Sequence, residues 1–111
     1  MNYEFKITPD FARDFKRLAK KNKHLADDFD RFLQSFVHTL GDIIPGTGGA
    51  YKIRMSATRT GKRSGYRLIY YFFHENEVYF LKIYHKAIQE TISESEKKEI
   101  QQLILEIKNM K

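Results

Sequence analysis

Apolar and polar residues alternate along the chain with two different periods, and each change of period marks the boundary of an expected helix or strand. Residues 3–7 alternate with a period of two, which predicts a short strand with one buried face. Thr8, Pro9 and Asp10 then supply an N-cap hydroxyl, a proline for the first helical position and an acid for the first turn, so a helix is expected to begin here. The apolar face of this helix comprises Phe11, Phe15, Leu18 and Ala19.

A longer apolar stripe predicts a second helix. The helical pattern lapses over residues 20–23, where a turn is expected, and then resumes. The stripe comprises Leu25, Phe29, Phe32, Leu33, Phe36, Val37 and Leu40. Gly41 follows the last apolar position, where a glycine commonly caps a helix. The sequence therefore predicts a helix that ends near Leu40.

The second half of the chain predicts three strands and a last helix. Residues 42–49, with one proline and three glycines, are expected to form an irregular connection. Residues 50–57, 66–73 and 78–85 are rich in Tyr, Phe, Ile and Val and are expected to form an antiparallel meander. Ser93 and Glu96 then have the spacing of a helix capping box, ahead of an apolar stripe. The expected order is βααβββα, an α+β fold in which an antiparallel-rich sheet packs against helices in one domain of residues 1–111.

Composition restricts the classes of function that the chain can have. The sequence has no cysteine, which excludes disulfides, thiol nucleophiles and cysteine-based zinc sites. No apolar run has the length of a signal peptide or of a membrane span, so a cytoplasmic location without a membrane partner is expected. The four histidines at positions 24, 38, 74 and 85 are scattered without metal-ligand spacing. The sequence therefore predicts neither a metal site nor a cofactor.

The net charge of +6 is concentrated in the middle of the chain. Residues 50–86 contain eight Lys or Arg residues against only two acids, Glu75 and Glu77. Concentrated positive charge attracts polyanions, among which nucleic acid is the default candidate. A solvated basic surface without a partner is the alternative, and composition alone does not decide between the two.

Strand alternation locates part of this charge on one surface. Lys52 and Arg54 lie two residues apart in an expected strand, so they project from the same face. Arg67 interrupts an otherwise apolar run in the next strand, where a charge needs a partner or a function. Cations also protect the exposed edges of sheets from aggregation, which is the alternative role for Lys52. Three cations on adjacent strands favour a shared function.

Residues 58–65 form a second basic segment. This connection contains Arg59, Lys62 and Arg63 and no acid, which suits a loop that contacts a phosphate backbone. It is not a nucleotide-binding P-loop, because Ser56 stands where that motif needs glycine and Arg63 where it needs Ser or Thr. We expect Arg59, Lys62, Arg63 and also Lys82 to bind nucleic acid.

Three segments of the sequence carry a resemblance to a known family. They are residues 41–49 (GDIIPGTGG), residues 51–54 (YKIR) and residues 61–71 (GKRSGYRLIYY). On these motifs the chain resembles the RelE/ParE toxin superfamily of type II toxin–antitoxin modules, and within it the HigB-like branch. The resemblance runs from the first expected strand to the last helix and implies the same βααβββα fold.

The resemblance also implies an activity and partners. Toxins similar to RelE cleave messenger RNA on the ribosome, by attack of a ribose 2′-hydroxyl on the adjacent phosphate and without a metal. By position, Lys52 and Arg54 match the family's paired basic residues, Arg67 its phosphate-binding arginine and Lys86 a further basic residue. The expected partners are therefore a cognate antitoxin protein, the ribosome and messenger RNA.

The chain departs from the family pattern at one position. RelE carries a catalytic tyrosine a few residues past Lys86, whereas this chain has Thr91 and Ile92 there. His85 is a candidate for this role, because a histidine can exchange protons near neutral pH, and a mechanism that rests on lysine alone is the other possibility. A strand-end histidine that caps a backbone group is the alternative. Lys52 or Lys86 is expected to act as the base.

The sequence is also compatible with two other functions. The ParE branch has the same fold but inhibits gyrase and is not a nuclease, and it has less use for a dense basic cluster. A non-catalytic RNA- or DNA-binding module would also combine basic charge with interleaved tyrosines.

Overall fold

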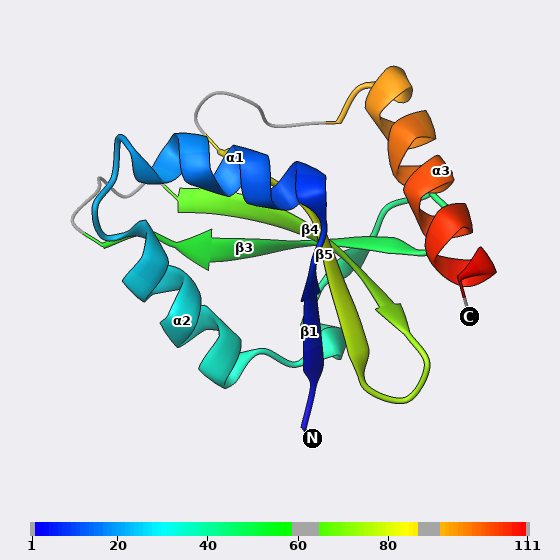
Figure 1. The fold of residues 1–111 in the computed structure, drawn as a ribbon, viewed down its shortest axis with the longest axis horizontal. Helices are drawn as coiled ribbons and strands as arrows, with labels where there is room; N and C mark the ends of the chain where they lie inside the picture. Colours follow the sequence, from blue (N-terminus) through cyan, green and yellow to red (C-terminus); the bar gives the residue numbers. More distant parts are fainter. Residues whose placement is uncertain (1, 59–64, 87–91, 111) are drawn as a thin grey trace.

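A computed structural model describes residues 2–58, 65–86 and 92–110, which form three α-helices and a five-stranded sheet (Figure 1). The elements are β1 (Glu4–Ile7), α1 (Pro9–Ala19), α2 (Leu25–Ser35), the 3-10 turn η1 (His38–Leu40), β2 (Asp42–Ile43), β3 (Ala50–Ser56), β4 (Gly65–Phe73), β5 (Glu77–His85) and α3 (Glu94–Asn109). The strand order in the sheet is β1-β5-β4-β3-β2. β1 is parallel to β5 and the other neighbours are antiparallel, so the predicted meander and the α+β class are confirmed.

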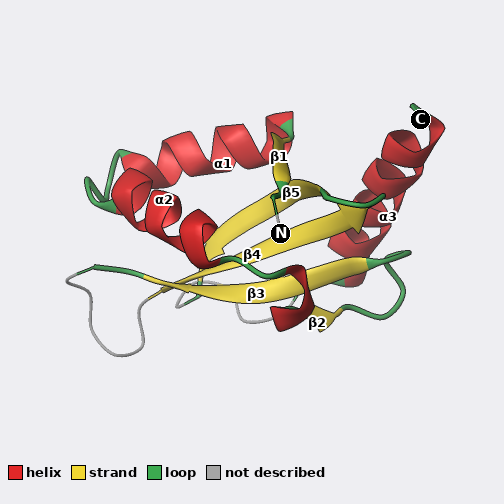
Figure 2. Ribbon diagram, turned by 90° about the horizontal axis from the view of Figure 1, so that it is seen from below, coloured by secondary structure: helices red, strands yellow, loops and turns green. Residues whose placement is uncertain are grey.

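The sheet separates two apolar cores. Helices α1 and α2 lie together on one side of the sheet, and α3 lies apart from them (Figure 2). The core under α1 and α2 is largely aromatic and includes Phe11, Phe29, Phe36, Tyr70 and Phe80. The core under α3 comprises Ile100, Ile104 and Ile107 of the helix with Ile44, Ala50, Ile69, Tyr71, Tyr79 and Leu81 of the sheet side. In β4, for example, consecutive residues enter opposite cores, with Leu68 and Tyr70 on the α1–α2 side and Ile69 and Tyr71 on the α3 side.

The starts of two helices agree with the sequence signals. Thr8 caps α1, because its hydroxyl accepts a hydrogen bond from the Phe11 amide at 3.4 Å. The same hydroxyl donates to the Phe80 carbonyl at 2.9 Å and ties the start of α1 to β5. Ser93 and Glu96 form the predicted capping box of α3, with 3.1 Å from the Glu96 amide to the Ser93 hydroxyl. Local chemistry thus determines where α1 and α3 begin.

The second helix ends earlier than predicted, and the expectation that it reaches Leu40 is wrong. Helix α2 ends at Ser35, and Phe36 is extended, with φ −67° and ψ 134°. This turn directs Phe36 into the aromatic core, where its ring packs edge-on against Tyr70 at 5.0 Å. The Tyr70 hydroxyl then donates to the His38 carbonyl at 2.6 Å and accepts from the Gly41 amide at 3.1 Å. Burial raises the pKa of Tyr70 to about 12. The contacts that Phe36, His38 and Gly41 make with Tyr70 thus override the helical pattern of the sequence and end α2 at Ser35.

The connection after η1 contains a short strand that the sequence did not predict. Asp42 and Ile43 form β2 and pair with Lys52 and Tyr51 of β3. The chain then turns through glycines with positive φ before β3 begins. Because β2 is only two residues long, no strand described in the structure pairs with the outer edge of β3 beyond Lys52. That edge remains open beside α2.

Candidate functional site

Strand register places the predicted basic residues on one face of the sheet. Arg54 of β3 lies directly opposite Arg67 of β4, and Arg67 lies opposite Tyr84 of β5. Lys52 lies two residues before Arg54 and therefore projects from the same face. Lys86 continues the β4–β5 ladder, since its amide donates to the Gly65 carbonyl at 3.0 Å, and alternation places it on the side of Tyr84. We name Lys52, Arg54, Arg67 and Lys86 the basic face.

The basic face lies next to the part of the sheet on which α3 packs. The helix packs on Ile69 and Tyr71 of β4 and on Tyr79 and Leu81 of β5, which share the face of Arg67 but lie nearer the other end of the sheet. Arg67, Lys52 and Lys86 are half-buried and Arg54 is exposed. The helix therefore leaves the basic residues accessible beyond its N-terminal end.

A cleft of about 900 Å³ opens along the free edge of β3. One wall is formed by α2 and η1, and the other by β3 together with Arg67. The lining residues include Arg31, Phe32, Phe36, Leu40, Asp42, Lys52, Arg54, Ser56, Thr58 and Arg67. Three of the four basic-face residues therefore border one cleft, whose opposite wall is partly apolar.

A buried carboxylate fixes the end of the cleft. Asp28 of α2, whose side chain is only 2% exposed, accepts hydrogen bonds from the amide of Thr58, at 2.8 Å, and from its hydroxyl. Arg31 donates to both Asp28 and the Thr58 hydroxyl. Burial tends to raise the pKa of Asp28, but the bonds from Thr58 and the charge of Arg31 outweigh it and hold the pKa below its usual range. We name Asp28, Arg31 and Thr58 the α2–β3 clamp.

The clamp was missed in the sequence, although one signal for it existed. Asp28 lies three residues after Leu25 and directly before Phe29, on the apolar stripe of the helix. An acid at such a position is expected to be buried and therefore to need partners. The sequence does not show which distant residues supply them.

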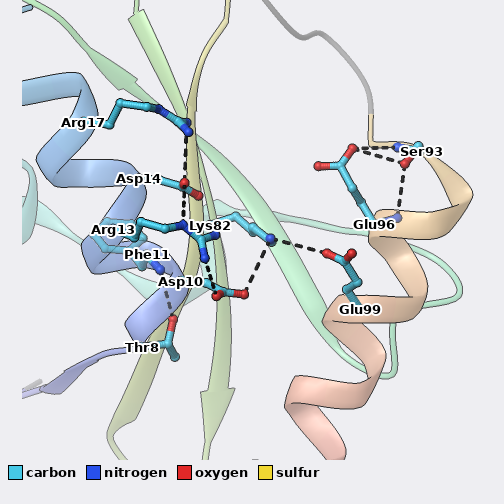
Figure 3. Close-up of polar contacts among 10 residues, drawn as sticks. All are labelled: Thr8, Asp10, Phe11, Arg13, Asp14, Arg17, Lys82, Ser93, Glu96 and Glu99. Carbon is cyan, nitrogen blue, oxygen red and sulfur yellow. Dashed lines mark hydrogen bonds and ion pairs between the residues drawn. The ribbon is translucent and has the colours of Figure 1, made fainter.

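Lys82 lies elsewhere and has acidic partners. Its side chain is only 12% exposed, and its Nζ lies 3.7 Å from a carboxylate oxygen of Asp10 and 3.6 Å from one of Glu99 (Figure 3). It thus bridges the first turn of α1 and the body of α3. The structure does not bring Lys82, which the sequence suggested as an RNA contact, to the cleft.

His85 projects from the side of the sheet that α1 and α2 cover. It lies opposite Tyr66 in the register, and the two rings meet edge-on at 5.2 Å. Tyr66 belongs to the aromatic core, and its hydroxyl accepts a hydrogen bond from the Asn22 amide group at 2.9 Å. Neighbouring residues of a strand point in opposite directions, so His85 is separated by the sheet from Arg67 and Lys86.

Some predicted features lie outside the part of the chain that the structure describes. Arg59, Lys62 and Arg63 fall within residues 59–64, and Thr91 is also not described. Within the described ranges, no group of three or more His, Cys, Asp or Glu side chains is arranged to hold a metal ion. No helix in those ranges is both long and apolar enough to cross a membrane.

Tyr84, which sequence reasoning overlooked, lies directly opposite Arg67 of the basic face. Its hydroxyl is buried and makes no hydrogen bond of regular geometry with any described residue. Burial raises the pKa of Tyr84, and the neighbouring Arg67 guanidinium opposes this effect. The Arg67 guanidinium interacts with the Tyr84 hydroxyl and tends to lower its pKa, but the contact lacks the geometry of a regular hydrogen bond. The fold thus places a tyrosine next to Arg67, with its ring packed against the core under α3.

The fold and the basic face together define a small α+β protein with cations gathered on one open side of its sheet. Its fold is similar to that of a solved structure of the E. coli toxin RelE, a mutant in the free state. That likeness has a TM-score of 0.50 at 19% sequence identity and covers 81% of this chain and 90% of the other.

Residues 10–111 match the family described as RelE toxin of the RelE/RelB toxin-antitoxin system. The chain therefore belongs to the RelE toxin family. Membership makes it the toxin of a toxin–antitoxin pair and implies an antitoxin partner.

Proposed function

We propose that this RelE-family toxin is a ribosome-dependent endonuclease that cuts messenger RNA and so inhibits translation. The observation that supports this proposal is the convergence of Lys52, Arg54 and Arg67 from adjacent strands at one cleft. A phosphate bound there would meet positive charge from two strands at once. Such charge is worth more beside apolar surface than in bulk water, and Phe32 and Phe36 line the α2 side of the same cleft.

In the proposed reaction the ribose 2′-oxygen attacks the adjacent phosphorus. The bond from the 2′-oxygen to phosphorus forms, the bond to the 5′-oxygen breaks, and the products are a 2′,3′-cyclic phosphate and a 5′-hydroxyl. Lys52 or Lys86, as the neutral amine, accepts the proton of the 2′-hydroxyl, and the 5′-oxygen takes up a proton from solvent water as it leaves. Arg54 and Arg67 bind the non-bridging oxygens, where one well-placed donor contributes about 3–4 kcal/mol to the transition state. No step in this proposal requires a metal ion.

The other predicted residues take different places in the proposal. Arg59, Lys62 and Arg63 are retained as contacts to the RNA backbone, because they follow Thr58 at the end of the cleft. Lys82 and His85 are left out, since the first is engaged with Asp10 and Glu99 and the second projects from the other face. We place the reaction in the cytoplasm, where ribosomes and messenger RNA are found. Coexpression of the antitoxin is expected to restore growth.

The test is to incubate the purified chain with ribosomes that are translating a defined messenger RNA and to map the new RNA ends. We expect cuts in phase with the codons, cyclic-phosphate ends and dependence on ribosomes. Arg67→Ala should lower the cleavage rate roughly 100- to 1,000-fold, the usual effect of removing a transition-state donor. Arg17→Ala is the matched control, because Arg17 is an exposed arginine of α1.

Three results would contradict the proposal. Inhibition of gyrase supercoiling without RNA cuts would assign the chain to the other activity of this fold. Binding of RNA without cleavage would make it a non-catalytic module. Equal activity of the Arg67→Ala and Arg17→Ala variants would remove the basic face from the mechanism.

A further inference from the structure

The hydroxyl of Tyr84 lies in a position that its packing alone does not explain. The ring packs against the apolar core under α3 and is held there with Phe73 and Ile92. The hydroxyl is buried but has no partner of regular hydrogen-bond geometry among the described residues. A phenylalanine would fill the same space without burying a polar group that lacks an aligned partner among the described residues. Packing therefore does not account for the hydroxyl, and its neighbours have to be considered.

The neighbour of this hydroxyl is a residue of the proposed site. Tyr84 and Arg67 are direct partners in the β4–β5 ladder, so their side chains leave the same face of adjacent strands. Arg54 continues this row on the other side of Arg67. The guanidinium of Arg67 is close enough to act on the phenol, although the contact is not yet a well-aligned hydrogen bond. In free enzymes, catalytic hydrogen bonds are often poorly aligned and tighten only when the substrate binds.

We propose that Tyr84 is a positioning residue that acts through Arg67. When Arg67 engages the RNA phosphate, the Tyr84 hydroxyl accepts a hydrogen bond from one guanidinium N–H and fixes the orientation of the others. The core-anchored ring supplies rigidity, because its position is set by packing under α3 and not by the RNA. The hydroxyl thereby improves alignment in the transition state more than it improves binding. This inference rests on the proposed nuclease function.

The test is a double-mutant cycle of Tyr84→Phe and Arg67→Ala, read as the single-turnover cleavage rate on ribosomes at saturating RNA. In the otherwise unchanged chain, Tyr84→Phe should lower the rate roughly tenfold, as the loss of one hydrogen bond to a charged group does. Affinity for the ribosome and the RNA should change by less than about twofold, and the thermal midpoint should stay the same or rise. In the Arg67→Ala background, Tyr84→Phe should have no further effect on the rate, because the group through which it acts is gone.

Tyr71→Phe is the matched control. Tyr71 lies on the same face as Tyr84, its pKa is also raised by burial, and it belongs to the core under α3 away from the arginines. Its loss should leave the cleavage rate unchanged.

The outcomes separate this inference from the proposed function. If the chain cuts RNA and Tyr84→Phe cuts equally fast, the role of Tyr84 is refuted while the nuclease proposal stands. A full tenfold loss that persists in the Arg67→Ala background also refutes it, since the hydroxyl would then act independently of Arg67. A slow variant with a lowered thermal midpoint would show a merely structural role. If the unchanged chain cuts no RNA, both proposals fail.

Discussion

Replacement of Asp28 by asparagine tests whether the α2–β3 clamp stabilises the fold. The carboxylate accepts hydrogen bonds from the Thr58 amide, the Thr58 hydroxyl and the Arg31 guanidinium. Asparagine keeps the shape of the side chain but replaces one accepting oxygen by an NH2 group. At least one donor of the clamp would therefore face another donor in a buried position, and the charge that holds Arg31 would be lost.

The magnitude follows from the burial of this carboxylate. With a side chain only 2% exposed, Asp28 has little water to replace the lost acceptor. Leaving a buried donor unsatisfied costs about 1–3 kcal/mol and more where a charge is involved, so we expect a loss of about 2–3 kcal/mol. This is a large part of the roughly 5–15 kcal/mol by which a domain is typically stable. The urea midpoint should fall by about 1 M or more.

The effect should depend on pH in a defined direction. The pKa of Asp28 in the folded protein lies below its ordinary value of 3.8, so the ionised form is the one that the fold stabilises. The contribution of the Asp28 carboxylate to the free energy of unfolding is fully present above the pKa of the unfolded state. It is lost as the pH falls through the pKa of the folded state. The difference between the variant and the unchanged chain should therefore be greatest at neutral pH and shrink below about pH 4.

Urea unfolding followed by circular dichroism at neutral and acid pH measures this difference. The matched control is Asp30→Asn, because Asp30 is an exposed acid of the same helix. We expect its loss to change the free energy of unfolding by no more than about 0.5 kcal/mol. Equal stability of the two variants at neutral pH, or a difference that does not shrink in acid, would refute the clamp as a stabilising ionic contact.

Two further substitutions test the fold outside the clamp. Gly41→Ala should destabilise the protein by about 1–3 kcal/mol, because the added Cβ would lie 2.8 Å from Cε1 of the Tyr70 ring. Thermal unfolding measures this loss, and an unchanged thermal midpoint would contradict the prediction. Lys82→Met should leave RNA affinity unchanged. It should alter the free energy of unfolding by no more than about 1 kcal/mol, because the ion pairs with Asp10 and Glu99 are long and partly solvated. A clear fall in RNA affinity would instead show that Lys82 contacts RNA.

Elements defined by local chemistry could be predicted from the sequence, whereas the end of α2 could not. The caps of α1 and α3 lie within three residues of the groups they satisfy, so they are visible in the sequence. The end of α2 depends on Phe36 and Tyr70, which are distant in sequence but whose rings pack 5.0 Å apart. Helical spacing continued to Leu40, yet Leu40 is 63% exposed in the structure. The apolar period alone therefore gave the wrong boundary.

The candidate site was predictable as far as alternation within one strand determines it. Lys52 and Arg54 share a face whatever their neighbours are, since they lie two residues apart. Which of Tyr84 and His85 joins them depends on the register between β4 and β5. An irregularity beside Ile69 and Tyr70 shifts that register, and the sequence gives no sign of it. The sequence offered His85 as a candidate because of its chemistry, whereas the structure places Tyr84 beside Arg67.

Two arginines of the basic face lie directly opposite each other on neighbouring strands. Like charges directly opposite each other destabilise a sheet, and Arg54 and Arg67 are such a pair. The strands stay paired despite this unfavourable arrangement, because the other face of the sheet contributes to the aromatic core of Phe36, Tyr70 and Phe80, and burial of that core stabilises the sheet. In the proposed function, a phosphate bound at this face would add negative charge beside both guanidinium groups. The pairing of Arg54 with Arg67 across the two strands therefore suits the anion-binding role proposed for the basic face.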